Sequence, residues 1–303
     1  MLIVNGVSNN LFSNRFILKH ISSDSIRLFI SHKINTKDED LFMFTLNEKI
    51  SRARLSAKYV RVNSLLMVSN ANLSHIGSCL SVADLLAVVH SLVQENNDEL
   101  IFSKGHAAAA MYASLSYEKV ISEDSLNTFG SDGSELIGHV NHAVEGISFS
   151  TGSLGHGLPL GIGVAIASKS KHVYVIVSDG ELNEGTTWES LAIASQLKLN
   201  NLTIIIDANG IQSFGETKEI LNLDPLIDKF LDFGWNCLDI DGNSILSLFE
   251  ALEKKSEIKP TVVIARTIKG KGIKEMEGKL EWHYKSPDKE KLKIFIKEIG
   301  NNA

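Results

Sequence analysis

The chain has 303 residues, of which 44% are hydrophobic, and this is enough to bury a full core in one domain or in one domain with an extension. Its formal net charge of -6 argues against a protein that tracks the phosphates of nucleic acids, because such proteins carry a basic surface. An anionic ligand must therefore be held by a local arrangement of side chains.

Cysteine usage and apolar runs restrict the cellular setting. Only Cys79 and Cys237 occur, without metal-ligand spacing, so neither a disulfide framework nor a zinc site is expected. No run approaches the roughly 18 apolar residues that a membrane span requires, and no secretion signal opens the chain. We expect a cytoplasmic protein in reducing surroundings, with neither nucleic acid nor membrane as a partner.

The first 43 residues differ in composition from the remainder. Asn, Ser, Ile and Lys dominate residues 1–43, which we expect to form an N-terminal extension, either disordered or the product of a misassigned start upstream of Met43. Thr45 and Glu48 then have the spacing of a capping box, and apolar residues recur at helical spacing after them. The sequence predicts that a helix beginning at Thr45 opens the folded domain, residues 44–303.

Short β-rich runs alternate with helical patterns through the rest of the chain. The runs cover residues 173–177, 202–207 and 261–266, and amphipathic stretches lie near 186–198 and 244–255. This alternation predicts an α/β fold with a mostly parallel sheet flanked by helices. Ligands of such sheets bind beyond the carboxyl ends of the strands, so the residues that follow each run are the candidates for function.

Oxygen ligands follow two of these runs. Asp179 comes just after the first run, and Asn209 just after the second. Neighbouring parallel strands would bring both ends together, and a divalent ion such as Mg²⁺ takes carboxylate, amide and carbonyl oxygens. We therefore expect Asp179, Asn209 and the carbonyl of Ile211 to bind Mg²⁺, or Ca²⁺ or Mn²⁺ in its place. A lone Asp-Gly at a strand end is as often a simple turn, so the prediction depends on the pair.

These residues resemble the thiamine diphosphate fingerprint, in which Asp-Gly at one strand end is followed by Asn at the next. The segment Ser178–Glu189 resembles the version of that fingerprint in the transketolase family. Other segments resemble transketolase motifs in the family's order: Ser103-Lys104-Gly105-His106, Gly138-His139, Thr151–Gly157, Lys269–Gly272 and Glu281-Trp282-His283. The resemblance covers residues 45–290 and implies the thiamine diphosphate-binding fold.

The resemblance also implies roles for individual residues. The cofactor-binding set that it implies is Gly152, Ser153, Leu154, Gly155, His156, Asp179, Gly180, Glu181, Asn209 and Ile211. The catalytic set is His75, His106, His139 and His283, for contacts with substrate or diphosphate, together with Glu184, for orienting the aminopyrimidine or linking paired sites. Imidazoles suit this chemistry because they donate hydrogen bonds or shuttle protons near neutral pH.

The chain departs from the family pattern at two places. Ser178 stands where the family has Gly, and we expect the fold to tolerate serine unless it clashes with the diphosphate. In the segment before and after His75, Leu73, Ser74 and Ile76 replace the family's Ser, Gly and Pro.

Full-length transketolases are much longer than this chain, and their second domain supplies the pyrimidine pocket and the activating glutamate. The resemblance therefore implies the N-terminal subunit of a split transketolase, active with a separately encoded C-terminal, pyrimidine-binding subunit in a two-plus-two assembly. It would transfer a two-carbon ketol (glycolaldehyde) unit from a ketose or ketose phosphate to an aldose. Two alternatives stay open: a subunit of another thiamine diphosphate enzyme, such as a 2-oxo acid dehydrogenase α subunit, and a catalytically degenerate cofactor-binding protein.

Overall fold

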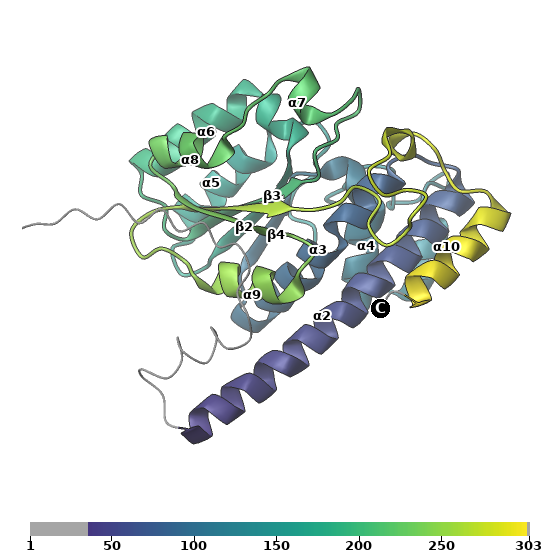
Figure 1. Cartoon of the computed structure of the whole chain (residues 1–303), viewed down its shortest axis with the longest axis horizontal. Helices are drawn as coiled ribbons and strands as arrows, with labels where there is room; N and C mark the ends of the chain where they lie inside the picture. The colour runs from purple at the N-terminus through teal and green to yellow at the C-terminus, as the bar shows by residue number, and fades with distance from the viewer. Residues whose placement is uncertain (1–35, 302–303) are drawn as a thin grey trace, which may run out of the picture. The chain divides into compact units, whose positions relative to one another are not determined.

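The computed structural model describes residues 36–301, with side chains from Thr45 onward. Its central sheet has the strand order β1-β2-β3-β5-β4, with bounds β1 (Glu99–Phe102), β2 (Val173–Ser178), β3 (Leu202–Ala208), β4 (Asn236–Asp241) and β5 (Thr261–Arg266). Each pair of neighbouring strands is parallel. The predicted α/β fold, with a parallel sheet flanked by helices, is confirmed (Figure 1).

Strands β1 and β4 have no counterpart among the predicted β runs. β1 has only four residues, and β4 is only partly buried and carries Asp239 and Asp241. Neither has the continuous apolar run that marks a strand buried on both faces. The strands β2 and β3 do have it, and they are buried along their whole lengths.

Helices cover both faces of the sheet (Figure 1). Alternate residues of a strand pack against opposite faces. Val173, Val175 and Val177 pack in one core with α5 (Gly157–Ala167), α6 (Gly185–Gln196) and α8 (Leu226–Asp232). Tyr174 and Ile176 pack in a second core, with residues of α2 (Thr36–Ala71), α3 (Ile76–Asn96), α4 (Ala108–Tyr117), α9 (Ile245–Glu253) and α10 (Lys289–Asn301). Ligands of such sheets bind beyond the carboxyl ends of the strands, at the edge where these two layers meet.

Helix α2 begins earlier than predicted. It runs over Thr36–Ala71, so Thr45 lies inside it and the predicted helix start there is wrong. Residues 37–44 contain neither Gly nor Pro, so nothing in them stops a helix, and Thr36 and Glu39 repeat the capping spacing upstream. The compact unit of the fold begins at Leu46, and residues 1–35 of the expected extension lie outside the described residues.

Helix α3 is long and apolar enough, by length and composition, to cross a membrane. In the fold it is a core helix, because 94% of the residues in its most apolar stretch are buried. Short turns connect the larger elements: α7 (Thr217–Ile220) and the 3₁₀ turns η1 (Gly105–Ala107), η2 (Glu123–Thr128), η3 (Gly180–Asn183) and η4 (Leu280–His283).

Candidate active site

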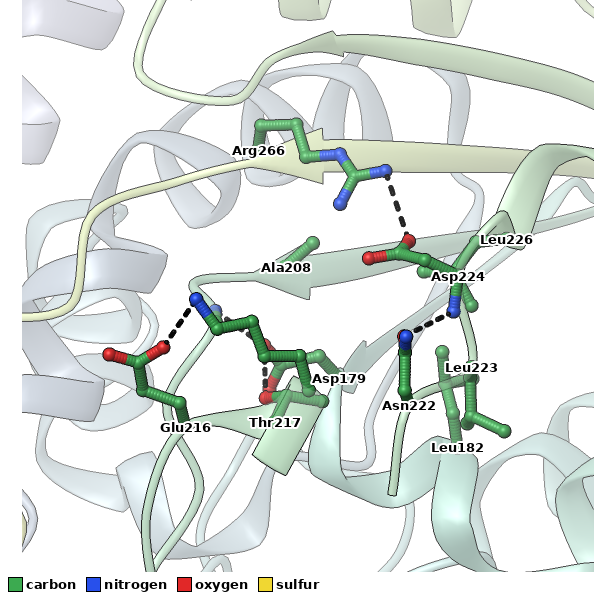
Figure 2. A pocket seen from close by; sticks show the side chains of 12 residues that line it. Asp179, Leu182, Ala208, Glu216, Thr217, Asn222, Leu223, Asp224, Leu226 and Arg266 are labelled. Carbon is green, nitrogen blue, oxygen red and sulfur yellow. Dashed lines mark hydrogen bonds and ion pairs between the residues drawn. The ribbon is translucent and has the colours of Figure 1, made fainter. Parts of the chain in front are cut away.

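The carboxyl ends of β2 and β3 meet, as the sequence predicts. The two strands pair in parallel, and the Gly210 N–H donates to Asp179 Oδ2 at 2.6 Å. Thr217 Oγ1 donates to the same oxygen at 3.4 Å, while the Gly180 N–H donates to Asp179 Oδ1 at 2.8 Å. Figure 2 shows the Asp179 carboxylate next to Thr217 near the end of β3. Asp179 and Asn209 therefore belong to one site.

A cavity of about 220 Å³, which we call the outer cavity, lies on one side of Asp179 (Figure 2). Its two cationic side chains already have carboxylate partners. Lys218 Nζ lies 2.8 Å from Glu216, and Arg266 Nη2 lies 2.9 Å from Asp239 and 4.0 Å from Asp224. The outer cavity is therefore a poor site for a diphosphate.

A second cavity of about 180 Å³, the inner cavity, shares Asp179 with the outer one. Basic, amide and hydroxyl groups line it together with glycine backbone: His75, Ser78, Lys104, His106, Gly152, Leu154, Ser178, Asp179, Gly180, Asn209, Ile211, Gln212, Ser213, Lys269 and His283. Cationic groups and a carboxylate in one cavity match the charges of a diphosphate and a divalent cation.

Lys269 is a buried cation that forms no ion pair among the described residues. It is 2% exposed, and its Nζ donates to the carbonyls of Ile211 at 3.0 Å and Gln212 at 3.4 Å. Burial and then the neighbouring Lys104 lower the pKa of Lys269 to about 8, so it is still mostly charged at neutral pH. Its Nζ forms no ion pair with a carboxylate in the described part of the chain. Such a charge is costly, so an anion in the inner cavity would stabilise it.

Lys104, which lines the inner cavity, forms a buried ion pair with Asp207. Both residues are 0% exposed, and Lys104 Nζ also donates to Ser78 O and Ser81 Oγ, each at 3.0 Å. Burial alone would raise the pKa of the Asp207 carboxyl, but Lys104 outweighs it and holds that pKa below its ordinary value. Sequence reasoning did not assign this pair or Lys269 to the site. A charged residue at the end of an isoleucine run, as at Asp207, is the signal that could have identified it.

The other three predicted histidines gather around His75. The centroid of its ring lies 4.8 Å from that of His283, 5.4 Å from His106 and 5.9 Å from His139. Burial, reinforced by His139, lowers the pKa of His75 to about 4; burial, reinforced by Lys269, lowers that of His283 to about 3. Burial also holds the pKa of His106 well below its usual range. These three imidazoles are neutral at pH 7, so each has one N–H donor and one acceptor nitrogen.

The loop before α5 divides its predicted residues between two cavities. Gly152 and Leu154 line the inner cavity, while Ser153 and His156 line a neighbouring, more open cavity of about 550 Å³. A Cβ atom at Gly152 would lie 2.9 Å from Cδ2 of His139, so only glycine fits there without displacing the histidine.

Glu181 and Gly155 are not among the residues that line the inner cavity, and their assignment to the cofactor stays a prediction. Glu181 is 0% exposed, and its carboxylate accepts hydrogen bonds from Ser103 Oγ and from the Gly155 N–H at 2.9 Å. Burial raises the pKa of Glu181 to about 7. The hydrogen bond from the Gly155 N–H holds the loop before α5, so Glu181 positions the residues of that loop that line the cavity.

Two further positions from the sequence analysis differ in their place at the site. Ser178 lines the inner cavity, and its hydroxyl accepts a hydrogen bond from the Glu181 N–H at 3.3 Å. Glu184 is exposed at the start of α6 and does not line the inner cavity. Its assigned role with the aminopyrimidine or a paired site stays a prediction.

Comparisons with known proteins agree with this geometry. Residues 52–303 match the family model described as transketolase, thiamine diphosphate binding domain. An apulose-4-phosphate transketolase subunit from Actinobacillus succinogenes is 39% identical over 268 residues, which cover 82% of this chain and 97% of that protein. The 6-deoxy-6-sulfo-D-fructose transketolase subunit SqwG of a Clostridium species is 33% identical over 259 residues, which cover 80% of this chain and 94% of that protein.

A solved structure has the same fold. Transketolase from Campylobacter jejuni superposes with a TM-score of 0.75 at 28% identity, covering 84% of this chain but 43% of that one. The chain thus spans less than half of that transketolase and nearly all of the two subunit relatives, whose description as subunits indicates a separate partner. The chain belongs to the transketolase family, in which it corresponds to the thiamine diphosphate binding domain.

Proposed function

We propose that this chain is the N-terminal subunit of a split transketolase, which transfers a two-carbon ketol unit from a ketose to an aldose. The inner cavity is the observation that carries the proposal. It is lined both by the buried ammonium of Lys269, which has no carboxylate partner among the described residues, and by the carboxylate of Asp179. A diphosphate and its divalent metal match these opposite charges, because Lys269 attracts phosphate oxygens and Asp179 attracts the metal.

The metal would be held by Asp179, Asn209 and the carbonyl of Ile211, with Mg²⁺, Ca²⁺ or Mn²⁺ as the ion. Two of these ligands are linked directly, since Asn209 Oδ1 accepts from the Ile211 N–H at 3.1 Å. Burial and then Asp207 raise the pKa of Asp179 to about 6, and a bound cation would favour the ionised carboxylate. The residues present therefore fit a magnesium diphosphate.

Thiamine diphosphate, when bound, supplies the electron sink for cleaving a carbon–carbon bond. The residues of this chain position the substrate. Neutral His75, His106 and His283 present N–H groups that stabilise negative charge on substrate oxygens. His139 belongs to the same cluster, and its ring centroid lies 5.9 Å from that of His75.

The inner cavity needs a second protein for the pyrimidine half of the cofactor. Its lining residues include no Phe, Tyr or Trp that could hold that ring. We propose that a separately encoded C-terminal subunit supplies the pyrimidine pocket and that two copies of each chain assemble. Apolar side chains on adjacent helices support a contact between copies of this chain: Ile166, Ile193 and Leu197 are 48%, 51% and 49% exposed. Glu184 lies at the other end of α6, and its role near a paired site stays a prediction.

Phe214 is the best candidate for an anchor to the C-terminal subunit. It is 84% exposed at the tip of a hairpin in which Ile211 pairs with Glu216, and Tyr284 Oη donates to Ser213 O at 2.6 Å. Ser213 lines the inner cavity, so a protein that closes the cavity also covers the tip. Aromatic anchors at an interface commonly dominate its binding energy.

Replacing Phe214 with alanine is expected to weaken association with the C-terminal subunit by about tenfold or more, roughly 1.4 kcal/mol. Sedimentation or surface plasmon resonance would measure the dissociation constant. Ile258→Ala is the matched control, because Ile258 is 67% exposed but precedes β5, at the opposite end of the sheet. Equal affinities for the Phe214→Ala variant and the unaltered chain would place the contact elsewhere.

The substrates are sugars or sugar phosphates. The relatives are named for apulose-4-phosphate and 6-deoxy-6-sulfo-D-fructose, both ketoses with an anionic group. We propose a ketose of this kind as the donor for this chain, in the cytoplasm.

The test is a ketol-transfer assay of this chain, of its partner and of the mixture, each with thiamine diphosphate and Mg²⁺. Transfer by the mixture alone is the expected result. Transfer by the isolated chain would contradict the split-enzyme proposal. Cofactor binding by the mixture without transfer from any ketose would support the degenerate binding protein instead.

A further inference from the structure

The Ser74 hydroxyl contacts the central histidine of the site. Ser74 Oγ lies 3.2 Å from His75 Nδ1, and Ser74 is half-buried. This is its one side-chain hydrogen bond within the described residues. The transketolase pattern has glycine at this position, and glycine offers no hydroxyl.

The backbone of His75 is held in an unusual conformation. With φ 75° and ψ 14°, it is a left-handed residue at the start of α3, a region that non-glycine residues seldom adopt. Its N–H donates to His283 O at 2.9 Å, and its carbonyl accepts from the Ser78 N–H at 3.0 Å. These backbone hydrogen bonds fix the position of the His75 backbone, from which the ring projects, and Ser74 contacts the Nδ1 edge of the ring.

We propose that Ser74 is a positioning residue that keeps His75 in the tautomer with its proton on Nε2, so that His75 serves as an N–H donor to a substrate oxygen. A serine hydroxyl can donate or accept. Among the described residues, His75 Nδ1 is the hydrogen-bond partner of this hydroxyl. In the proposed arrangement the hydroxyl donates to Nδ1, and the one proton of the neutral ring lies on Nε2.

The assignment gives His75 a defined part in the proposed reaction, on which this inference rests. An N–H on Nε2 stabilises an oxygen that gains negative charge, whereas an unprotonated Nε2 would remove a proton. His75 lies between His106, His139 and His283 in the cluster, so its tautomer decides what the cluster presents to the substrate.

The first test reads the tautomer without cofactor or turnover, so its failure is distinct from failure of the proposed function. ¹⁵N NMR of the full chain with labelled histidine reports which ring nitrogen carries the proton, and a His75→Gln variant identifies the resonances. We expect Nε2–H in the unaltered chain and in Ser74→Thr, and a mixture of tautomers in Ser74→Ala. A proton on Nδ1 in the unaltered chain, or no change in Ser74→Ala, would overturn the proposal.

The second test uses the complex with the C-terminal subunit. Ser74→Ala is expected to lower kcat for ketol transfer about tenfold with little change in the KM of the donor. Without Ser74 the His75 ring adopts both tautomers, and this weakens its hydrogen bond to the substrate oxygen mainly in the transition state. Ser74→Thr should restore most of kcat. Ser170→Ala, at an exposed serine before β2, is the control and should match the unaltered chain. A kcat in Ser74→Ala equal to that of the control would refute the positioning role.

Discussion

Replacing Asp179 with asparagine is expected to lower the affinity for thiamine diphosphate in the presence of Mg²⁺ by about 100-fold or more, roughly 2.7 kcal/mol. Asp179 is the one charged group among the three proposed metal ligands, and the other two offer only neutral oxygens. Isothermal titration calorimetry of the complex with and without Mg²⁺ measures the effect. Asp228→Asn, at an exposed position on α8, is the control. Unaltered cofactor affinity in Asp179→Asn would remove Asp179 from the metal site.

The same variant is not expected to destabilise the cofactor-free chain at pH 7. Burial and then Asp207 raise the pKa of Asp179 from 3.8 to about 6. A raised folded-state pKa stabilises the fold below pH 3.8 and loses that contribution as pH rises through about 6. At pH 7 the buried charge opposes folding, and asparagine removes it. Urea unfolding should therefore show a free energy of unfolding within about 1 kcal/mol of the unaltered chain or above it.

Replacing Lys104 with methionine is expected to destabilise the fold by about 3–5 kcal/mol, because Asp207 is then left charged and buried without its partner. Both side chains are almost fully inaccessible, with 1% and 0% exposed. The folded-state pKa of Asp207 is depressed, so the contribution of the pair is full above its ordinary pKa of 3.8 and is lost as pH falls through the folded value. The loss should therefore be constant between about pH 6 and 8.

A double variant separates this effect from simple loss of packing. Lys104→Met combined with Asp207→Asn removes both charges, and it should be more stable than Lys104→Met alone. Urea unfolding of the two single variants and the double variant gives the interaction energy. A loss below about 1 kcal/mol in Lys104→Met would show that the pair adds little to the fold.

The elements predicted correctly are those whose sequence carries a physical signal of burial. β2, β3 and β5 are near-continuous Val and Ile runs, whereas β4 is partly buried and carries acidic residues, so it was missed. The predicted start of α2 was wrong because the sequence has two segments with capping spacing, and it does not show at which of them the helix begins.

The site could be predicted where a motif places a functional residue at a strand end. Asp179 and Asn209 are such residues, and the structure brings them together. Adjacent residues of one motif alternate between cavity and core, and the sequence does not show that Glu181 is buried, so its assignment to the cofactor stays a prediction. Lys269 lies in a motif that was recognised, but only the fold shows that its charge is buried without a carboxylate partner in the described residues.

Anomalous scattering from Mn²⁺, in crystals of the complex with the C-terminal subunit grown with thiamine diphosphate, tests the central claim most directly. We expect a single strong peak in this chain between the Asp179 carboxylate, the Asn209 amide oxygen and the Ile211 carbonyl, joined to diphosphate density beside Lys269. Diphosphate density in the outer cavity, or Mn²⁺ bound by other residues, would contradict the account.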